Sequence, residues 1–154
     1  MTPPPARTAE QRKQDTLRRL EHDQDLWVAT AAADGGAPYL VPLSFVWDGS
    51  TLLIATPADS PTGRNLVATG TTRLGVGPTR DVVMIEGDVE PLTPGELPAA
   101  EAGRFAAETG FDPRRLATRY LYFRVRPRRV QAWREADELD GRELMRDGKW
   151  LVGD

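Results

Sequence analysis

The sequence predicts a mainly β fold, a small six-stranded β-barrel with accessory helices. Short runs rich in β-branched and aromatic residues recur along the chain, separated by turn dipeptides such as Asp34-Gly35 and Asp48-Gly49. One stretch rich in proline and alanine, residues 91–118, interrupts these runs and indicates short helices. The strands do not alternate with helices and no Gly-x-Gly-x-x-Gly motif is present, so a parallel α/β sheet with a dinucleotide site is not expected.

Length and composition limit the possible functions. A chain of 154 residues fits a single domain, residues 1–154, with its own hydrophobic core. It has no cysteine, which excludes disulfides, thiolate nucleophiles and cysteine-ligated metals, so redox chemistry requires a bound cofactor. The formal net charge is -3 and acidic and basic residues are interspersed, which argues against nucleic acid as a partner.

The pattern of charged and apolar residues predicts neither an export signal nor a membrane span. The first residues run into a charged stretch without an apolar region, so we expect no secretory signal and a cytoplasmic location. The longest weakly charged run, residues 26–47, is broken by Asp34, two glycines and two prolines. It is therefore not expected to span or contact a membrane.

The first half of the chain predicts a helix followed by three strands. Within the N-terminal segment, residues 1–24, the stretch 9–24 is polar with leucines at 17 and 20, a pattern typical of a helix on the outside of a barrel. Glycines supply the tight turns that follow. The expected elements are a helix at residues 9–24 and strands at 26–33, 39–47 and 51–55.

The second predicted strand is apolar on both faces. Tyr39, Val41 and Leu43 share one face, and Leu40 and Pro42 share the other. Such a strand fits a barrel wall that is covered outside by a helix or by another subunit. Because Pro42 has no ladder donor, we expect the strand to be unpaired or bulged there, with backbone groups free for a ligand.

The second half of the chain predicts three further β elements. A hairpin is expected over residues 73–77 and 81–90, with a bulge at Gly87. A long strand over residues 119–133 is expected to break at Pro127. The C-terminal extension, residues 135–154, should contain a last hairpin around Asp147-Gly148.

Residues 55–66 carry the strongest functional signal. Ser60 is a good helix N-cap and Pro61 suits the first helical position, so a helix should begin here with its N–H groups exposed to an anion. Thr56, Ser60 and Thr62 add hydroxyls, and Arg64 offers a planar guanidinium that matches phosphate oxygens. On this local pattern alone, a well-capped helix without a ligand is the favoured explanation of the segment.

The order of several short motifs extends this signal over most of the chain. The motifs are Ala29-Thr30, Asp34-Gly35, Pro38, Pro42, Phe45-Val46-Trp47-Asp48-Gly49, Ala55-Thr56, Arg64-Asn65-Leu66, Ile85-Glu86-Gly87 and Tyr122-Phe123-Arg124-Val125 leading to Trp133. Their order and spacing, between residues 20 and 133, resemble the pyridoxamine 5'-phosphate oxidase-like flavin split-barrel family.

The resemblance implies a split (Greek-key) β-barrel that forms a homodimer, with FMN or the deazaflavin F420 bound at the subunit interface. It implies that backbone groups of the second strand contact the ring, that the helix start binds the phosphate, and that Trp133 reaches the ring from the partner subunit. Arg80, at a turn, is added as a candidate for an anionic cofactor tail. The candidate cofactor-binding residues are Val41, Pro42, Leu43, Thr56, Ser60, Thr62, Arg64, Asn65, Arg80 and Trp133.

The sequence also departs from true pyridoxamine phosphate oxidases. Gly63-Arg64 stands where that family carries a basic pair, and its C-terminal substrate motif is not evident, so vitamin B6 activity is not expected. Only one histidine, His22, is present, which argues against haem ligation. No catalytic acid, base or metal ligand is assigned.

The expected function is therefore that of an FMN- or F420-dependent oxidoreductase acting on an unknown small molecule. FMN is favoured because only one arginine is assigned to the phosphate, whereas the oligoglutamate tail of F420 needs a longer basic channel. A protein that stores, carries or senses the cofactor without turnover remains the alternative.

Overall fold

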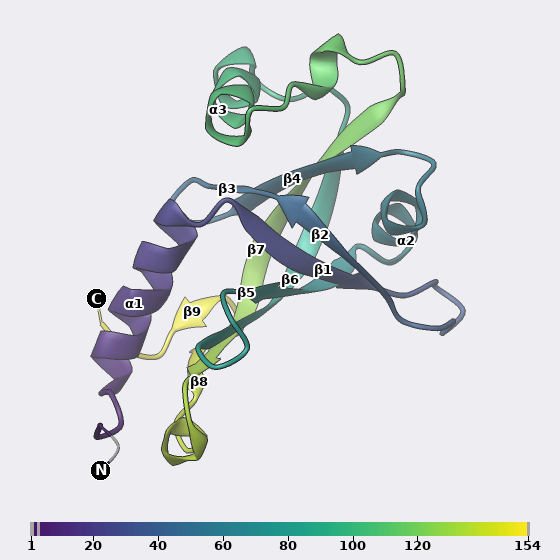
Figure 1. Ribbon diagram of the computed structural model, residues 1–154. Helices are drawn as coiled ribbons and strands as arrows, with labels where there is room; N and C mark the ends of the chain where they lie inside the picture. The colour runs from purple at the N-terminus through teal and green to yellow at the C-terminus, as the bar shows by residue number, and fades with distance from the viewer. Residues whose placement is uncertain (1, 3, 154) are drawn as a thin grey trace.

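The computed structural model describes residue 2 and residues 4–153 (Figure 1). Over these residues the chain is mainly β, a nine-stranded antiparallel sheet that curls into a half-barrel with three α-helices around it. The strands are β1 (Asp25–Thr30), β2 (Tyr39–Ser44), β3 (Val46–Trp47), β4 (Leu52–Pro57), β5 (Thr71–Val76), β6 (Val82–Leu92), β7 (Tyr120–Trp133), β8 (Glu143–Arg146) and β9 (Lys149–Trp150). The helices are α1 (Ala9–His22), α2 (Pro61–Thr69) and α3 (Ala99–Thr109), with short 3-10 turns η1 (Pro113–Arg115) and η2 (Ala136–Glu138).

The two ends of the sheet meet in one stretch of chain. The strand order is β2-β1-β5-β6-β7-β4-β3, and Phe45 alone separates β2 from β3. The first half of this stretch pairs with β1 and the second half with β4, so the two ends of the sheet are joined through the chain at Phe45. The expected count of six strands is too low, because this strand is interrupted and because the β8–β9 hairpin joins the sheet through β7.

The expected bulge at Pro42 is wrong. Pro42 lies opposite Trp27 in an unbroken register between β1 and β2. The Phe45 N–H donates to the Gln24 carbonyl in this same register, and hydrogen-bonded pairs alternate along antiparallel strands, so Trp27 and Pro42 form a non-hydrogen-bonded pair. The missing donor of Pro42 therefore faces away from β1, toward the free edge of β2, where proline is tolerated.

The bulge near Gly87 is confirmed, but the extra residue lies on the partner strand. The register between β6 and β7 shifts between Glu86 and Gly87, which leaves Arg128 unpaired in β7. A Cβ on Gly87 would lie 2.5 Å from Val125 Cγ1, so the close approach of the two strands requires glycine. The expected break at Pro127 is wrong, because β7 continues through this residue. Pro127 has no N–H to donate, and the bulge at the neighbouring Arg128 interrupts the ladder at the same place.

Two apolar cores lie on opposite faces of the sheet. The larger core fills the inside of the curl, where side chains such as Val28, Ile54 and Phe123 are fully buried. The smaller core lies under α3, which covers β3, β4 and β7 from outside (Figure 1). Its members are Val46, Leu53, Ala55, Leu97, Ala102, Phe105 and Tyr122.

Helix α1 is held to the C-terminal part of the chain by charged groups, which we call the α1 network. The Arg7 guanidinium donates to both carboxylate oxygens of Glu138, at 2.7 and 3.0 Å, and Glu138 is only 2% exposed. Arg12, also buried, donates to the Glu138 backbone carbonyl at 2.9 Å. The α1 network consists of Arg7, Arg12, Asp15, Arg19, Asp81, Arg134 and Glu138.

The last hairpin is formed as expected. β8 and β9 pair through a two-residue turn in which Asp147 and Gly148 have φ values of 53° and 77°. These left-handed conformations match the twist of tight hairpins.

None of the helices described has both the length and the apolar character needed to cross a membrane.

Candidate functional site

The turn between β4 and α2, residues 57–60, is built around one hydroxyl. Ser60 is the N-cap of α2 and Pro61 is its first residue, as expected. The Ser60 hydroxyl accepts from the Gly63 N–H at 3.0 Å and donates to the Pro57 carbonyl at 2.8 Å. The Thr56 hydroxyl lies 3.3 Å from that of Ser60. Ser60 therefore holds the turn in shape, and Thr56 stands beside it.

Gly63 is required by the turn itself. A Cβ at this position would lie 2.4 Å from the Pro57 carbonyl oxygen and 3.0 Å from that of Ala58. These are backbone atoms, which cannot move aside as a flexible side chain can. The start of α2 is therefore packed directly against the end of β4.

Thr62 carries the free polar groups of the first helical turn. Pro61 has no N–H, the Gly63 N–H donates to the Ser60 hydroxyl, and the Arg64 N–H donates to the Ser60 carbonyl at 2.9 Å. Within residues 2 and 4–153, neither the backbone N–H nor the hydroxyl of Thr62 forms a hydrogen bond, although the residue is only 3% exposed. These two groups are positioned to meet an anion at the positive end of the helix.

Arginine side chains divide into those with partners and those without. Among the residues that the structure describes, all but two arginines have a hydrogen bond or an ion pair through their guanidinium groups. The two exceptions are Arg64 and Arg119, and both are exposed. Both lie at the β4–α2 turn, since Arg64 is in the first turn of α2 and the Arg119 carbonyl accepts from the Ala58 N–H at 2.9 Å.

Arg119 was not among the residues expected at the site. It precedes β7 and is 55 positions from Arg64 in the sequence, so local pattern gives no link between them. Pro57 lies opposite Tyr120 in the β4–β7 register, and this pairing brings Arg119 to the turn. Only an assumed pairing between the predicted strands 51–55 and 119–133 would have placed Arg119 at this turn.

The other residues expected near the helix lie on the same side of the molecule. Asn65 donates from its side-chain amide to the Thr30 hydroxyl at 3.1 Å, which ties α2 to the end of β1. Val41 and Leu43 are half-buried against the main core, and Pro42 is exposed on β2. Helix α2 packs against β1 and β2, so the structure brings this strand and the β4–α2 turn together.

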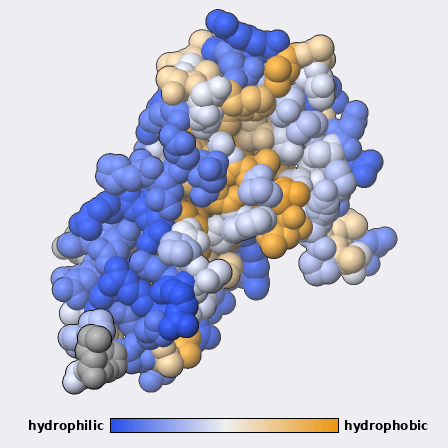
Figure 2. Space-filling view, in the orientation of Figure 1, coloured by the Kyte–Doolittle hydropathy of each residue, from blue (hydrophilic) through white to orange (hydrophobic). Residues whose placement is uncertain are grey.

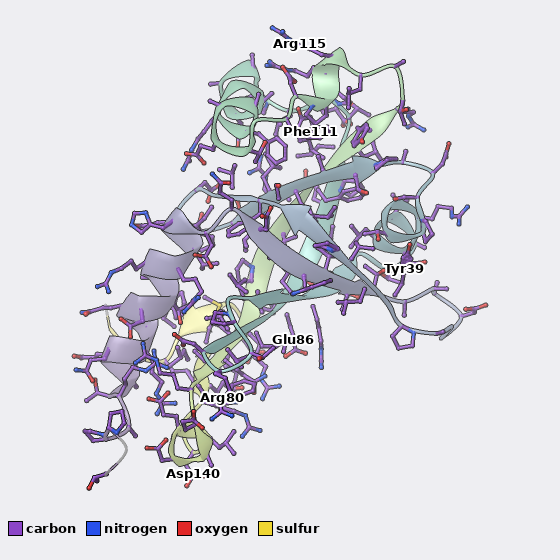
Figure 3. All side chains as sticks on the ribbon, in the orientation of Figure 1. Tyr39, Arg80, Glu86, Phe111, Arg115 and Asp140 are labelled. Carbon is purple, nitrogen blue, oxygen red and sulfur yellow. The ribbon has the colours of Figure 1, made fainter. Side chains whose placement is uncertain are left out.

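Arg80 and Trp133 lie elsewhere in the chain. α2 leads into β5 through Gly70, whereas Arg80 lies in the turn beyond the far end of β5, roughly 20 Å further along at strand geometry. Figure 3 shows Tyr39 beside α2 and Arg80 at the other end, near β8. Arg80 is paired with Glu135 at 2.8 Å, and the Arg142 guanidinium lies 5.8 Å from the Trp133 ring centroid. One chain alone does not bring these two residues to the turn.

A groove of about 540 Å³ runs between the β1–β2 connection, the first half of β5 and the middle of β6. This volume falls in the range of about 300–1,000 Å³ that is typical of small-molecule sites. The Asn65–Thr30 hydrogen bond lies between the groove and α2. The lining residues include Ala29, Thr30, Thr69, Thr72, Arg73, Glu86 and Arg128.

Apolar side chains are exposed beside these features. Trp27, Leu40 and Val67 are 50%, 60% and 53% exposed, on β1, β2 and α2 respectively. Trp27 and Leu40 lie on the outer face of the sheet, and Figure 2 shows an apolar area over β1 and β2. A surface of this kind is typical of a contact with another molecule.

One family model and several solved structures match this chain. The family model described as pyridoxamine 5'-phosphate oxidase matches residues 13–134. No curated protein has a sequence that matches the chain. Among solved structures, one described as F420 reductase superposes with a TM-score of 0.60 at 20% identity, covering 73% of this chain and 93% of its own.

Two further structures show the same fold with different descriptions. A putative pyridoxamine 5'-phosphate oxidase from Listeria innocua has a TM-score of 0.63 at 15% identity, covering 80% of this chain and 98% of its own. HutZ, the haem storage protein of Vibrio cholerae, has a TM-score of 0.59 at 15% identity, covering 75% and 89%. At these identities the likeness concerns the fold.

Proposed function

Because this chain belongs to the pyridoxamine 5'-phosphate oxidase family, we propose that it is a homodimeric oxidoreductase that binds FMN or F420 and acts on a small molecule. The observation that carries the proposal is the pair of unpaired arginines at one turn. Arg64 and Arg119 lie beside a helix start whose Thr62 N–H and hydroxyl are also free. Unpaired guanidinium groups and free donors together are suited to a phosphate.

The residues present fit the phosphate of such a cofactor. Arg64 and the two free groups of Thr62 would hold it, while Ser60 and Gly63 keep the turn in shape. The exposed Asp59 is the single acidic side chain within residues 57–60, so the two arginines leave the turn with an excess of positive charge. When bound, FMN or F420 supplies the hydride chemistry, and the chain supplies position and electrostatics.

The apolar surface supports a homodimer. Leu40 and Val67 are exposed on either side of the place where α2 packs against β2, next to the proposed phosphate site. Burial of this surface against a second copy removes apolar area from water and places the cofactor between subunits. We expect a dimer in solution at micromolar concentration. A monomeric mass by light scattering would contradict this part of the proposal.

A carrier or storage role without turnover is the second candidate. The likeness to HutZ, described as a haem storage protein, favours it, because that protein shares the fold. In this chain the sole histidine, His22, is exposed on α1, away from the β4–α2 turn. We therefore propose a flavin or deazaflavin as the ligand in either case, and we expect no pyridoxine 5'-phosphate oxidase activity.

One titration series tests the proposal. The purified protein is titrated separately with FMN, F420 and haemin, and absorption and fluorescence report binding. We expect saturable binding of FMN or F420 and no specific haemin spectrum. Binding of haemin alone would overturn the flavin assignment. Reoxidation of the bound, reduced cofactor by small electron acceptors, compared with free cofactor, then separates an oxidoreductase from a carrier.

A further inference from the structure

We infer that the buried face of α1 binds a small monovalent anion such as chloride, held by the guanidinium Nε of Arg12 and the hydroxyl of Thr16. This site is separate from the β4–α2 turn and independent of the proposed cofactor. Two buried polar groups without partners indicate it, together with a positive charge that no carboxylate among the described residues pairs with. A bound anion would fasten α1 to the C-terminal part of the chain.

Arg12 and Thr16 share one face of α1. With Leu20 they are the buried residues of this helix, and α1 packs against β3, β7 and β8 (Figure 1). Side chains four apart on a helix are neighbours, with about 5–6 Å between their Cβ atoms. Arg12 is 6% exposed and Thr16 is 1% exposed. A ligand that contacts both groups is therefore enclosed between α1 and the sheet.

The Arg12 guanidinium is only partly satisfied. Nη1 donates to the carbonyls of Ala132 and Glu138, at 3.4 and 2.9 Å, and Nη2 donates to the Asp140 carbonyl at 3.4 Å. The Nε–H is buried and has no hydrogen-bond partner among residues 2 and 4–153, and the same is true of the Thr16 hydroxyl. A buried donor without a partner destabilises a fold, so both groups favour a ligand that accepts from them.

The charge of Arg12 also lacks a counter-ion. The α1 network contains four arginines and three carboxylates, and each carboxylate forms an ion pair with an arginine other than Arg12. Among the residues that the structure describes, Arg12 contacts only backbone carbonyls. A guanidinium removed from water without a counter-ion is costly, and a bound anion offsets that cost.

An anion suits these groups better than a water molecule does. A buried water typically forms about three hydrogen bonds, and two of them use its own hydrogens, which need acceptors. The Nε–H of Arg12 can only donate, and the Thr16 hydroxyl can donate as well. An anion accepts from both groups and neutralises the guanidinium at the same time. Because both groups are enclosed, the ligand is a single small ion.

Unfolding in two salts tests this site. Urea denaturation is measured at constant ionic strength while sodium chloride replaces sodium gluconate, whose anion is too large for an enclosed site. The proteins are wild type, Thr16→Val, Arg12→Met and Arg18→Met. Thr16→Val keeps the shape of the side chain without its hydroxyl. Arg18→Met is the matched control for Arg12→Met, because Arg18 lies on the exposed face of the same helix.

We expect chloride to stabilise wild type saturably, with a rise of about a hundredfold in the folding equilibrium constant at about 100 times the dissociation constant. Arg18→Met should respond in the same way. Thr16→Val and Arg12→Met should respond by less than about threefold. In gluconate, Thr16→Val should be more stable than wild type, because it buries no unpaired hydroxyl, and chloride should reverse this order.

A chloride effect that is missing from wild type, or that is equal in all four proteins, would overturn the inference, since an equal effect is a general action of salt. If circular dichroism shows that Arg12→Met does not fold, the response of Thr16→Val decides. Crystals soaked in bromide give a direct view. Anomalous diffraction should locate a bromide ion between Arg12 and Thr16, and a water molecule at that place in the presence of bromide would contradict the site.

Discussion

The β4–α2 turn and the α1 network both contain arginines, but those of the network have partners and those of the turn have none among the described residues. In the α1 network, Arg7 is bound to both oxygens of Glu138 and Arg12 to backbone carbonyls, and each is largely buried. At the turn, Arg64 and Arg119 are exposed and have no partner among the described residues. An arginine-rich composition alone does not distinguish these roles. The presence of a partner does, which separates charges that hold the fold from charges available to a ligand.

The difference has an energetic basis. A buried ion pair stabilises the fold only while both partners are present, because removal of one leaves the other charged and poorly solvated. An exposed, unpaired arginine adds little to stability, since water already solvates it. Substitutions in the α1 network should therefore change stability, and substitutions of the unpaired arginines should change ligand binding.

Glu138→Gln should have the largest effect on stability. It removes the carboxylate that accepts from the Arg7 guanidinium at 2.7 and 3.0 Å and from the Arg134 N–H at 2.9 Å. We expect a loss of about 3–5 kcal/mol in the free energy of unfolding, measured by urea denaturation at pH 7. The control is Glu135→Gln, whose exposed pair with Arg80 should contribute less than about 1 kcal/mol. Equal effects of the two variants would contradict the comparison.

The same carboxylate gives the effect a pH dependence. Hydrogen bonds from Arg7 hold the pKa of Glu138 at about 2, below its usual value of 4.5. A lowered pKa in the folded state adds stability that is complete above 4.5 and is lost as the pH falls toward 2. The difference between wild type and Glu138→Gln should therefore shrink over this range. A difference that stays constant from pH 7 to pH 3 would show that charge is not its source.

Gly63→Ala should have the next largest effect, because it forces a methyl group against backbone. The new Cβ would lie 2.4 Å from the Pro57 carbonyl oxygen. We expect a loss of about 1–3 kcal/mol, seen as a lower unfolding midpoint. Gly103→Ala is the matched control, since it also lies in a helix but has no atom within 4 Å of its Cβ position. That variant should gain about 0.5–1 kcal/mol.

Tyr122→Phe should have the smallest effect, and in the opposite direction. The Tyr122 hydroxyl is buried without a hydrogen-bond partner among the described residues, and burial raises its pKa. Removing it should stabilise the protein by about 1 kcal/mol, while the edge-to-face contact with Phe105, 5.6 Å between centroids, is kept. This outcome would show that the Tyr122 hydroxyl is an unsatisfied buried group and contributes nothing to the fold. Destabilisation by thermal melting would show that the hydroxyl has a partner.

Local rules predicted the turn well. Ser60 and Pro61 occupy the expected cap and first helical positions, because capping depends on neighbouring residues alone. The hairpin at Asp147-Gly148 formed for the same reason. The barrel-like curl also followed from the number and spacing of strands, whereas the interruption at Phe45 did not, since it depends on which strands pair at each end.

Long-range pairing decided the features that the sequence pattern could not predict. Arg7 and Glu138 are 131 positions apart, so no sequence pattern links them. Arg80 looked suitable for an anion because it lies in a turn, but the topology places it at the end of β5 remote from α2 and pairs it with Glu135. The effect of Pro42 depended on which edge of β2 is free, and that is a property of the sheet rather than of the strand.

The most direct measurement compares FMN and F420 with their phosphate-free counterparts in wild type and Arg64→Ala. We expect Arg64→Ala to weaken binding of the phosphorylated cofactors by about tenfold to a hundredfold, a loss of about 1.5–3 kcal/mol, and Arg64→Lys to recover only part of it. Riboflavin should bind both proteins alike, and the unfolding midpoint should not change. Equal affinity of wild type and Arg64→Ala for FMN and F420 would place the phosphate elsewhere and contradict the account.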